Sequence, residues 1–211
     1  MNEKYSNPIM EKTIKAVVFV EPLSLILEKN QRKAAPVDET VITRMYHTIQ
    51  IPKVGLDCDE YEVRGETDFF NRKVSYQDLL DTQSIEDLNL LLSERYQEEI
   101  SKLFGPHDTP YHLEDINTHI NMCITGAKGD EIMHITALFH DLGKSICKDG
   151  GTYKNHQNVS AMYALKAFSE IDDMQYNEII LENIYYHLLA HEGISTKVAH
   201  RDNISDEQLE S

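Results

Sequence analysis

The sequence predicts a mainly α-helical protein with a small β-containing region near its N-terminus, and three observations support this fold class. From residue 84 to residue 195, apolar side chains recur at the i, i+3, i+4 and i+7 spacing of one helix face. Residues 14–20 are instead rich in β-branched side chains and stop at Glu21-Pro22, which is typical of a strand. The hydrophobic content of 41% over 211 residues suffices for the packed core of one domain with an appendage.

The N-terminal region, residues 1–83, is predicted to contain short strands and has no motif that indicates its role. After the strand at 14–20, residues 23–27 have the composition of a short helix. A period-2 alternation of apolar side chains then runs through residues 41–51 and predicts a second strand. We expect residues 61–63 to pair with this second strand.

Residues 84–195 form the predicted helical domain. Ser84 resembles an N-cap with the acidic Asp87 three positions later, and their helix is expected to continue to Gly105-Pro106. The other expected helices cover residues 113–124, the apolar run that Asp130 caps and His140 ends, the segment from His156 onward, and the segment from Ile180 to His191. Residues 196–211 form a polar tail in which Ser205-Asp206-Glu207 resembles the start of a truncated helix.

The charge of the chain limits its partners. A formal net charge of −16 argues against extended binding to a nucleic-acid backbone, which requires basic surface. Lys144, Lys148 and Lys154 nevertheless cluster in the sequence, so a small phosphorylated ligand in a locally basic pocket is compatible with the composition. The apolar run at 16–20 is too short to span a bilayer, and the polar N-terminus does not resemble a signal peptide. These features predict a cytoplasmic protein that does not bind membranes.

Cys58, Cys123 and Cys147 are far apart and form no Cys-x-x-Cys pair, so neither a zinc ribbon nor a disulfide framework is expected. Cys123 lies on an inward helix face and is interpreted as a small buried apolar residue.

Histidines lie on the apolar faces of four successive predicted helices, namely His119, His140, His156, and His187 with His191. One such histidine is usually a core residue, but repetition on four helices beside Asp141 is hard to explain by packing. A buried carboxylate beside imidazoles is costly unless a positive or hydrogen-bonding group compensates it, and a divalent metal would do so. The His187/His191 pair has no glutamate in the His-Glu-x-x-His position, which excludes a simple zinc protease. The remaining histidines are interpreted as structural or surface residues: His107, His112, His134 and His200.

These residues resemble the HD superfamily of metal-dependent phosphohydrolases. The resemblance covers residues 111–192 and is carried by four segments: Asn117-Thr118-His119-Ile120, Leu138-Phe139-His140-Asp141-Leu142-Gly143-Lys144, Lys154-Asn155-His156-Gln157-Asn158-Val159-Ser160-Ala161, and Ile184-Tyr185-Tyr186-His187.

The resemblance implies an HD-type helical domain around one or two divalent ions (Mn, Fe, Ni, Co, Zn or Mg). His119, His140 and Asp141 would hold the first ion, while His156 and His187 would hold a second ion or contact the phosphate. Asp141 and Lys144 are the implied catalytic residues. Lys144, Lys154 and His191 are the implied substrate-binding residues. The implied substrate of this phosphomonoesterase or phosphodiesterase is nucleotide-like or another small phosphorylated compound.

Two other classes remain open, a di-iron oxygenase of the same fold and a non-catalytic metal-binding scaffold. An RNA-end phosphatase is disfavoured by the acidic composition. The family pattern also has a closing aspartate on a later helix, whereas the later aspartates here, Asp202 and Asp206, lie in a polar segment. We therefore expect either a fragment of a longer protein or a divergent member that holds its first metal weakly.

Overall fold

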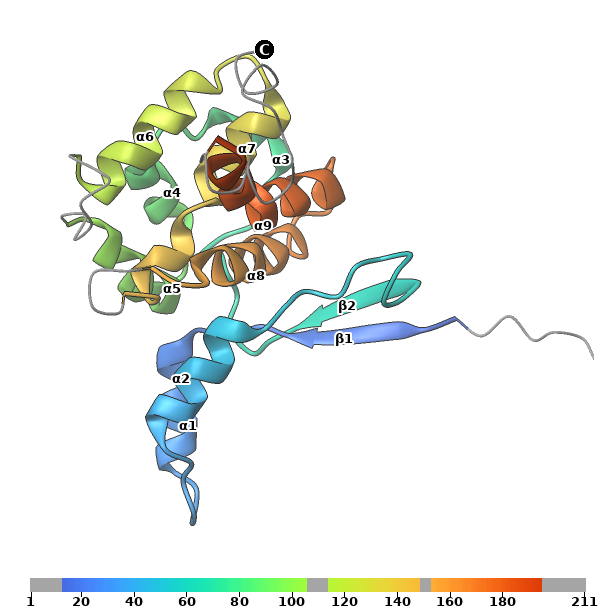
Figure 1. Ribbon diagram of the computed structural model, residues 1–211, viewed down its shortest axis with the longest axis vertical. Helices are drawn as coiled ribbons and strands as arrows, with labels where there is room; N and C mark the ends of the chain where they lie inside the picture. Colours follow the sequence, from blue (N-terminus) through green and yellow to red (C-terminus); the bar gives the residue numbers. More distant parts are fainter. Residues whose placement is uncertain (1–12, 106–113, 149–152, 195–211) are drawn as a thin grey trace, which may run out of the picture.

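The computed structural model describes residues 13–105, 114–148 and 153–194, and the side chains of residues 189–194 lie outside this description. Within these residues the chain forms nine α-helices and one two-stranded sheet, which confirms the mainly helical fold class. The sheet and the first two helices project from one side of a body that is built from the remaining helices (Figure 1).

The sheet consists of β1 (Lys15–Phe19) and β2 (Glu60–Arg64), which run parallel with Lys15 opposite Glu60. The strand predicted at 14–20 is therefore confirmed. Parallel strands need a crossover connection, and α1 (Leu23–Gln31) with α2 (Glu39–Thr48) lie within it. The predicted helix at 23–27 is confirmed and extends to Gln31.

The predicted strand at 41–51 is wrong, because this segment forms α2. Asp38 caps the helix and accepts a hydrogen bond from the Thr40 N–H at 2.8 Å. Tyr46 is buried and donates its hydroxyl to the Glu21 carbonyl at 2.7 Å. Met45, one of the alternating apolar residues of this segment, is 62% exposed on the helix. The pairing predicted for residues 61–63 is wrong for the same reason, since β2 pairs with β1.

The helix predicted from Ser84 to Gly105 is instead broken into α4 (Ile85–Leu91) and α5 (Glu94–Ile100), which follow α3 (Tyr76–Asp81). The Ser84 cap is confirmed, since its hydroxyl accepts from the Asp87 N–H at 3.1 Å. A tertiary contact ends α4: Leu92 forms an antiparallel bridge with Phe70, and the Ser93 N–H donates to the Phe69 carbonyl at 2.9 Å.

The other helices of the body are α6 (Ile116–Gly126), α7 (Glu131–Phe139), α8 (His156–Phe168) and α9 (Asn177–Ile194). Nearly every residue of α8 is buried, and this helix packs on α9 and on the 3₁₀ turn η2 (Leu142–Ser145) that follows α7. Aromatic rings of Phe69, Tyr96, Phe139 and Tyr163 meet in the core. This core combines residues from both sides of the predicted boundary at 83/84, so that division into regions stays a prediction.

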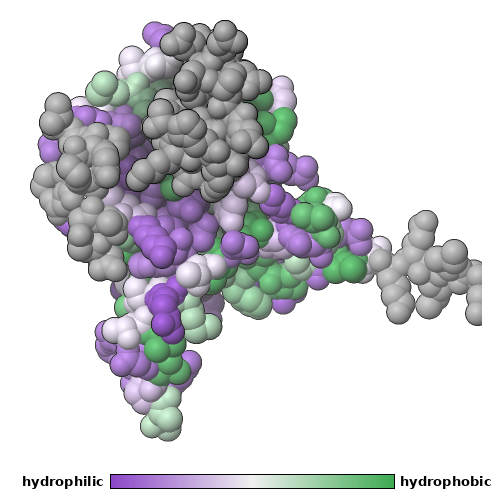
Figure 2. Space-filling view, in the orientation of Figure 1, coloured by the Kyte–Doolittle hydropathy of each residue, from purple (hydrophilic) through white to green (hydrophobic). Residues whose placement is uncertain are grey.

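On the face shown in Figure 2, hydrophobic residues lie among hydrophilic ones over the sheet, and the uncovered part of the helical body is mostly hydrophilic. The exposed apolar side chains of the sheet region include Val17, Phe19 and Leu56. Among the described helices, none is both long and apolar enough to cross a membrane.

Candidate metal centre

The end of α7 brings a carboxylate into the interior. Asp130 starts this helix by accepting from the Met133 N–H at 3.0 Å. The helix ends at Phe139, His140 is its C-cap, and the next residue, Asp141, is only 1% exposed. A buried carboxylate is costly without compensation, so its neighbours determine what the site can do.

Gly143 explains how this carboxylate reaches the next helix. A β-carbon at this position would overlap the carbonyl oxygen of His156 and lie 2.9 Å from the Ser160 nitrogen. With glycine, the Gly143 N–H instead donates to Ser160 Oγ at 2.9 Å. The turn therefore packs directly on the first turn of α8 and carries Asp141 close to His156.

Four imidazoles from different elements surround Asp141. The Nε2 atoms of His140 and His119 lie 3.3 and 3.5 Å from Oδ2. The Nε2 atoms of His156 and His187 lie 3.1 and 3.7 Å from Oδ1. The structure thus brings together all five residues that the sequence indicated as metal ligands.

The Nδ1 atom of each of these four histidines faces an oxygen acceptor. An oxygen of this kind only accepts, so Nδ1 carries a proton, and in a neutral ring the Nε2 lone pair is then available to a metal. The acceptors are the carbonyl of Ala137 for His140 at 2.9 Å, of Tyr153 for His156 at 2.7 Å, of Ile184 for His187 at 2.6 Å, and the carboxylate of Glu114 for His119 at 3.3 Å.

The centre consequently contains more acceptors than donors. The Nε2 atoms of His156 and His187 lie 3.1 Å apart. Asp141 Oδ1 is buried and is not satisfied by a hydrogen bond among the described residues, although His156 Nε2 lies 3.1 Å away. Lone pairs that face one another in the interior need a proton or a metal cation between them. The donor set therefore fits a divalent ion.

The pKa values show how the metal-free cluster distributes charge. Burial raises the pKa of Asp141, but the charge and hydrogen bond of His140 outweigh it and hold the pKa well below its usual value. Burial lowers the pKa of His140, but Asp141 outweighs it and raises the pKa to about 10. Burial lowers the pKa of His187 to about 4. A protonated His140 thus offsets the carboxylate, and a metal would replace that proton.

Lys144 lies inside the same cluster. Its side chain is 8% exposed, and Nζ lies 2.7 Å from Asp141 Oδ2 and 5.7 Å from the centre of the Tyr153 ring. The lysine predicted to contact substrate phosphate therefore already contacts the central carboxylate.

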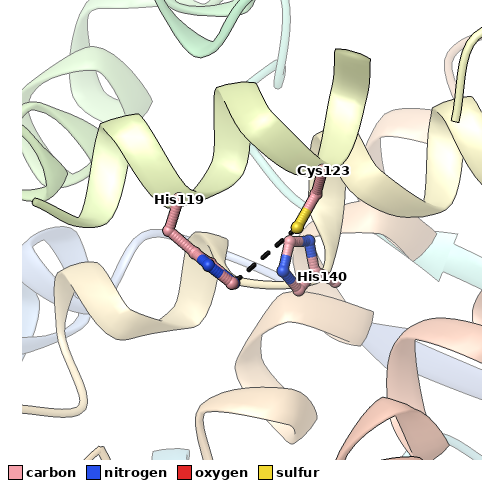
Figure 3. A group of neighbouring side chains, drawn as sticks. All are labelled: His119, Cys123 and His140. Atoms are coloured by element: carbon pink, nitrogen blue, oxygen red, sulfur yellow. Dashed lines mark hydrogen bonds between the residues drawn. The ribbon is translucent and has the colours of Figure 1, made fainter. Parts of the chain in front are cut away.

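Cys123 was interpreted as a small buried apolar residue. It is partly buried and packs against the core, but its sulfur also has two imidazoles as neighbours. Figure 3 shows its sulfur facing His119 and His140, with Sγ 3.8 Å from His119 Nε2. Hydrogen bonds with His119 and then with His140 lower the pKa of the Cys123 thiol to about 6, and the same contact with Cys123 raises the pKa of His119. The i, i+4 spacing of His119 and Cys123 was the signal in the sequence that could have identified this contact.

Within the described residues, two groups of three ligand atoms could each hold an ion. One comprises His119, Cys123 and His140, and the other comprises Asp141, His156 and His187. The ligand atoms of each group lie within 4.8 Å of one another. Zinc bonds its ligands at about 2.0–2.3 Å, so small shifts would close either group around one ion.

The other predicted site residues have different outcomes. Lys154 is exposed in the turn before α8. The side chain of His191 lies outside the described residues, as do His107, His112, His200, Asp202 and Asp206. His134 is buried with Nε2 2.9 Å from the Thr82 carbonyl, which agrees with its interpretation as a structural residue.

No family model, curated protein or solved structure matches the chain.

Proposed function

We propose that this protein is a cytoplasmic metal-dependent phosphohydrolase that acts on a nucleotide-like or other small phosphorylated substrate. One observation carries the proposal. The Nε2 atoms of His119, His140, His156 and His187 converge within 3.1 to 3.7 Å of the buried carboxylate of Asp141. The order of these residues along the chain supports the resemblance to the HD superfamily.

The residues of the centre would hold the metal and supply negative charge to it. His119, His140 and Asp141 would hold one ion, and His156 and His187, which face the other oxygen of Asp141, would hold a second ion or contact the phosphate. A bound divalent ion lowers the pKa of its water and polarises a phosphoryl oxygen. Asp141 would remain anionic throughout, because its low pKa keeps it unprotonated near neutral pH.

A cavity of about 500 Å³ beside the centre supports a phosphorylated substrate. Lys102, Lys144 and Lys148 line it together with Tyr153 and Ser145. Cavities of about 300–1,000 Å³ accommodate ligands of nucleotide size. Three ammonium groups outnumber the carboxylate of Glu99, which also lines this cavity, and they favour an anionic ligand although the chain as a whole is acidic. Lys144 contributes to both the cavity and the Asp141 cluster, so it would connect the phosphate to the metal centre.

Metal analysis combined with a substrate panel tests this proposal. The purified protein is loaded with manganese, iron or zinc and assayed with phosphomonoesters, phosphodiesters and nucleotides. We expect phosphate or nucleotide release that a chelator abolishes and added metal restores. Lys102→Ala and Lys148→Ala should raise KM more than they lower kcat. A fully metal-loaded protein that hydrolyses no member of the panel would contradict the enzymatic proposal.

The two adjacent ligand groups also support a second candidate function, a di-iron oxygenase, because imidazole and carboxylate ligands suit iron. Two bound iron ions with an optical spectrum that changes on exposure to oxygen would favour this function over hydrolysis. Metal that stays bound without either activity would favour a scaffold with a structural metal.

A further inference from the structure

We propose that Cys123 is a metal ligand, so that the centre has two unlike halves: a sulfur-containing group of His119, Cys123 and His140, and an oxygen-containing group of Asp141, His156 and His187. This inference rests on metal binding by the centre and does not require phosphohydrolase activity.

The sulfur of Cys123 lies close to two imidazoles. His119 and Cys123 are one turn apart on α6, and both side chains point toward His140 at the end of α7 (Figure 3). The three ligand atoms lie within 4.8 Å of one another, and Sγ is 3.8 Å from His119 Nε2. This group therefore forms from two elements that pack together through their apolar faces.

The surroundings of Cys123 differ from those of the other two cysteines. Cys147 is 1% exposed in the hydrophobic core, and Cys58 is 5% exposed with its sulfur 3.9 Å from the Lys53 carbonyl. Cys123 is only partly buried and has two imidazoles as neighbours. A cysteine that served packing alone would be expected among apolar side chains, as Cys147 is.

A thiolate ligand would also bring negative charge to a bound metal ion. Neutral imidazoles do not offset the charge of a dication, whereas an anionic ligand offsets part of it. Asp141 supplies one to the group with His156 and His187, and Lys144 already compensates part of it. The Cys123 thiol supplies the other when it loses its proton to solvent and its sulfur bonds to the ion. The thiolate would therefore add a second anion beside His119 and His140, which otherwise have only Asp141 Oδ2 nearby.

A sulfur ligand would also change which metal ions the group prefers. Soft thiolate ligands favour zinc, iron and cobalt, whereas carboxylate and water suit magnesium and manganese. A ligand set of two histidines and one cysteine also leaves the fourth tetrahedral position open to water or substrate. The sulfur-containing group should thus prefer zinc or iron, while the oxygen-containing group accepts harder ions.

Cobalt(II) tests this assignment directly, because a cobalt–thiolate bond produces a charge-transfer band in the near ultraviolet. The metal-free protein is titrated with cobalt, and the band should grow with the first equivalent. Cys123→Ser and Cys123→Ala should abolish the band while circular dichroism stays helical. Cys58→Ser is the matched control and should keep it.

A competition experiment measures selectivity without any assay of hydrolysis. Cys123→Ser should reduce the preference for zinc over manganese by roughly 10- to 100-fold, which is the range that even outer-sphere partners of metal ligands contribute. X-ray absorption of the zinc-loaded protein should show one sulfur at about 2.3 Å. Bound cobalt without a charge-transfer band in the parent protein, or a band that persists in Cys123→Ala, would overturn the assignment.

Discussion

Two buried carboxylates of this protein have opposite surroundings. Glu99 is 2% exposed, and each of its oxygens accepts one hydrogen bond: from the Ser24 N–H at 2.8 Å and from the Tyr163 hydroxyl at 2.5 Å. Asp141 is 1% exposed, but Oδ1 has no hydrogen-bond partner among the described residues. Four imidazole nitrogens face its oxygens, and Lys144 Nζ donates to Oδ2 at 2.7 Å.

The difference separates a structural carboxylate from one that is arranged for a ligand. Neutral donors satisfy Glu99, so the folded chain alone completes its hydrogen bonds. Asp141 receives one hydrogen bond, from Lys144 to Oδ2, but the imidazole nitrogens around it are themselves acceptors, so Oδ1 is satisfied only with a proton or a cation between them. Removal of Glu99 should therefore affect folding, whereas removal of Asp141 should affect metal binding.

The largest expected effect is the loss of metal from Asp141→Ala. This substitution removes the carboxylate whose oxygens face all four histidines, so metal content should fall and any hydrolysis should disappear. The circular dichroism spectrum should stay helical. Metal analysis after gel filtration measures the outcome, and undiminished metal content would refute the assignment of the centre.

Glu99→Ala should have the reverse effect. The Ser24 N–H and the Tyr163 hydroxyl would lose their acceptor in the interior, which costs about 2–4 kcal/mol of unfolding free energy. Urea denaturation measures this loss, and metal stoichiometry at low temperature should match the parent. Tyr163→Phe removes only one donor and should cost less. Loss of metal from Glu99→Ala while the fold persists would break the distinction between the two carboxylates.

Gly143→Ala tests whether the close approach of η2 to α8 places Asp141. The added β-carbon would overlap the His156 carbonyl, so the turn must move and stability should fall by about 1–3 kcal/mol. Metal affinity should fall with it. Gly126→Ala in α6 is the control, because its β-carbon meets nothing within 4 Å. That variant should gain about 0.5–1 kcal/mol and keep its metal.

The smallest expected effect belongs to a carboxylate near the surface. Asp78 forms a capping box with Ser75 and pairs with Arg72, and these contacts, Arg72 first, lower its pKa well below the ordinary 3.8. A lowered pKa in the folded state gives stability that is present above pH 3.8 and is lost as pH falls through the folded-state pKa. Asp78→Asn should therefore cost about 0.5–2 kcal/mol at neutral pH, and less as the solution is acidified. Thermal unfolding at several pH values measures it, and a constant difference down to strong acid would contradict this account.

The sequence by itself determined the features that depend on local order. Asp130 as an N-cap and the apolar spacing after it define α7, and they place His140 and Asp141 at its end. The same periodicity placed His119, His156 and His187 on inward helix faces. Capping and helical spacing act over three or four residues, so one stretch of chain contains the whole signal.

The tertiary structure decided what depends on residues far apart in the chain. The contact of Leu92 with Phe70 breaks the helix that local periodicity predicted as continuous. β2 pairs with β1 across 45 positions, which the alternation at 41–51 did not indicate. The tertiary structure also placed Cys123 beside His140 and paired Lys144 with Asp141. Helical spacing specifies which face a side chain occupies, but only the packing of one helix on another specifies which atoms that face will meet.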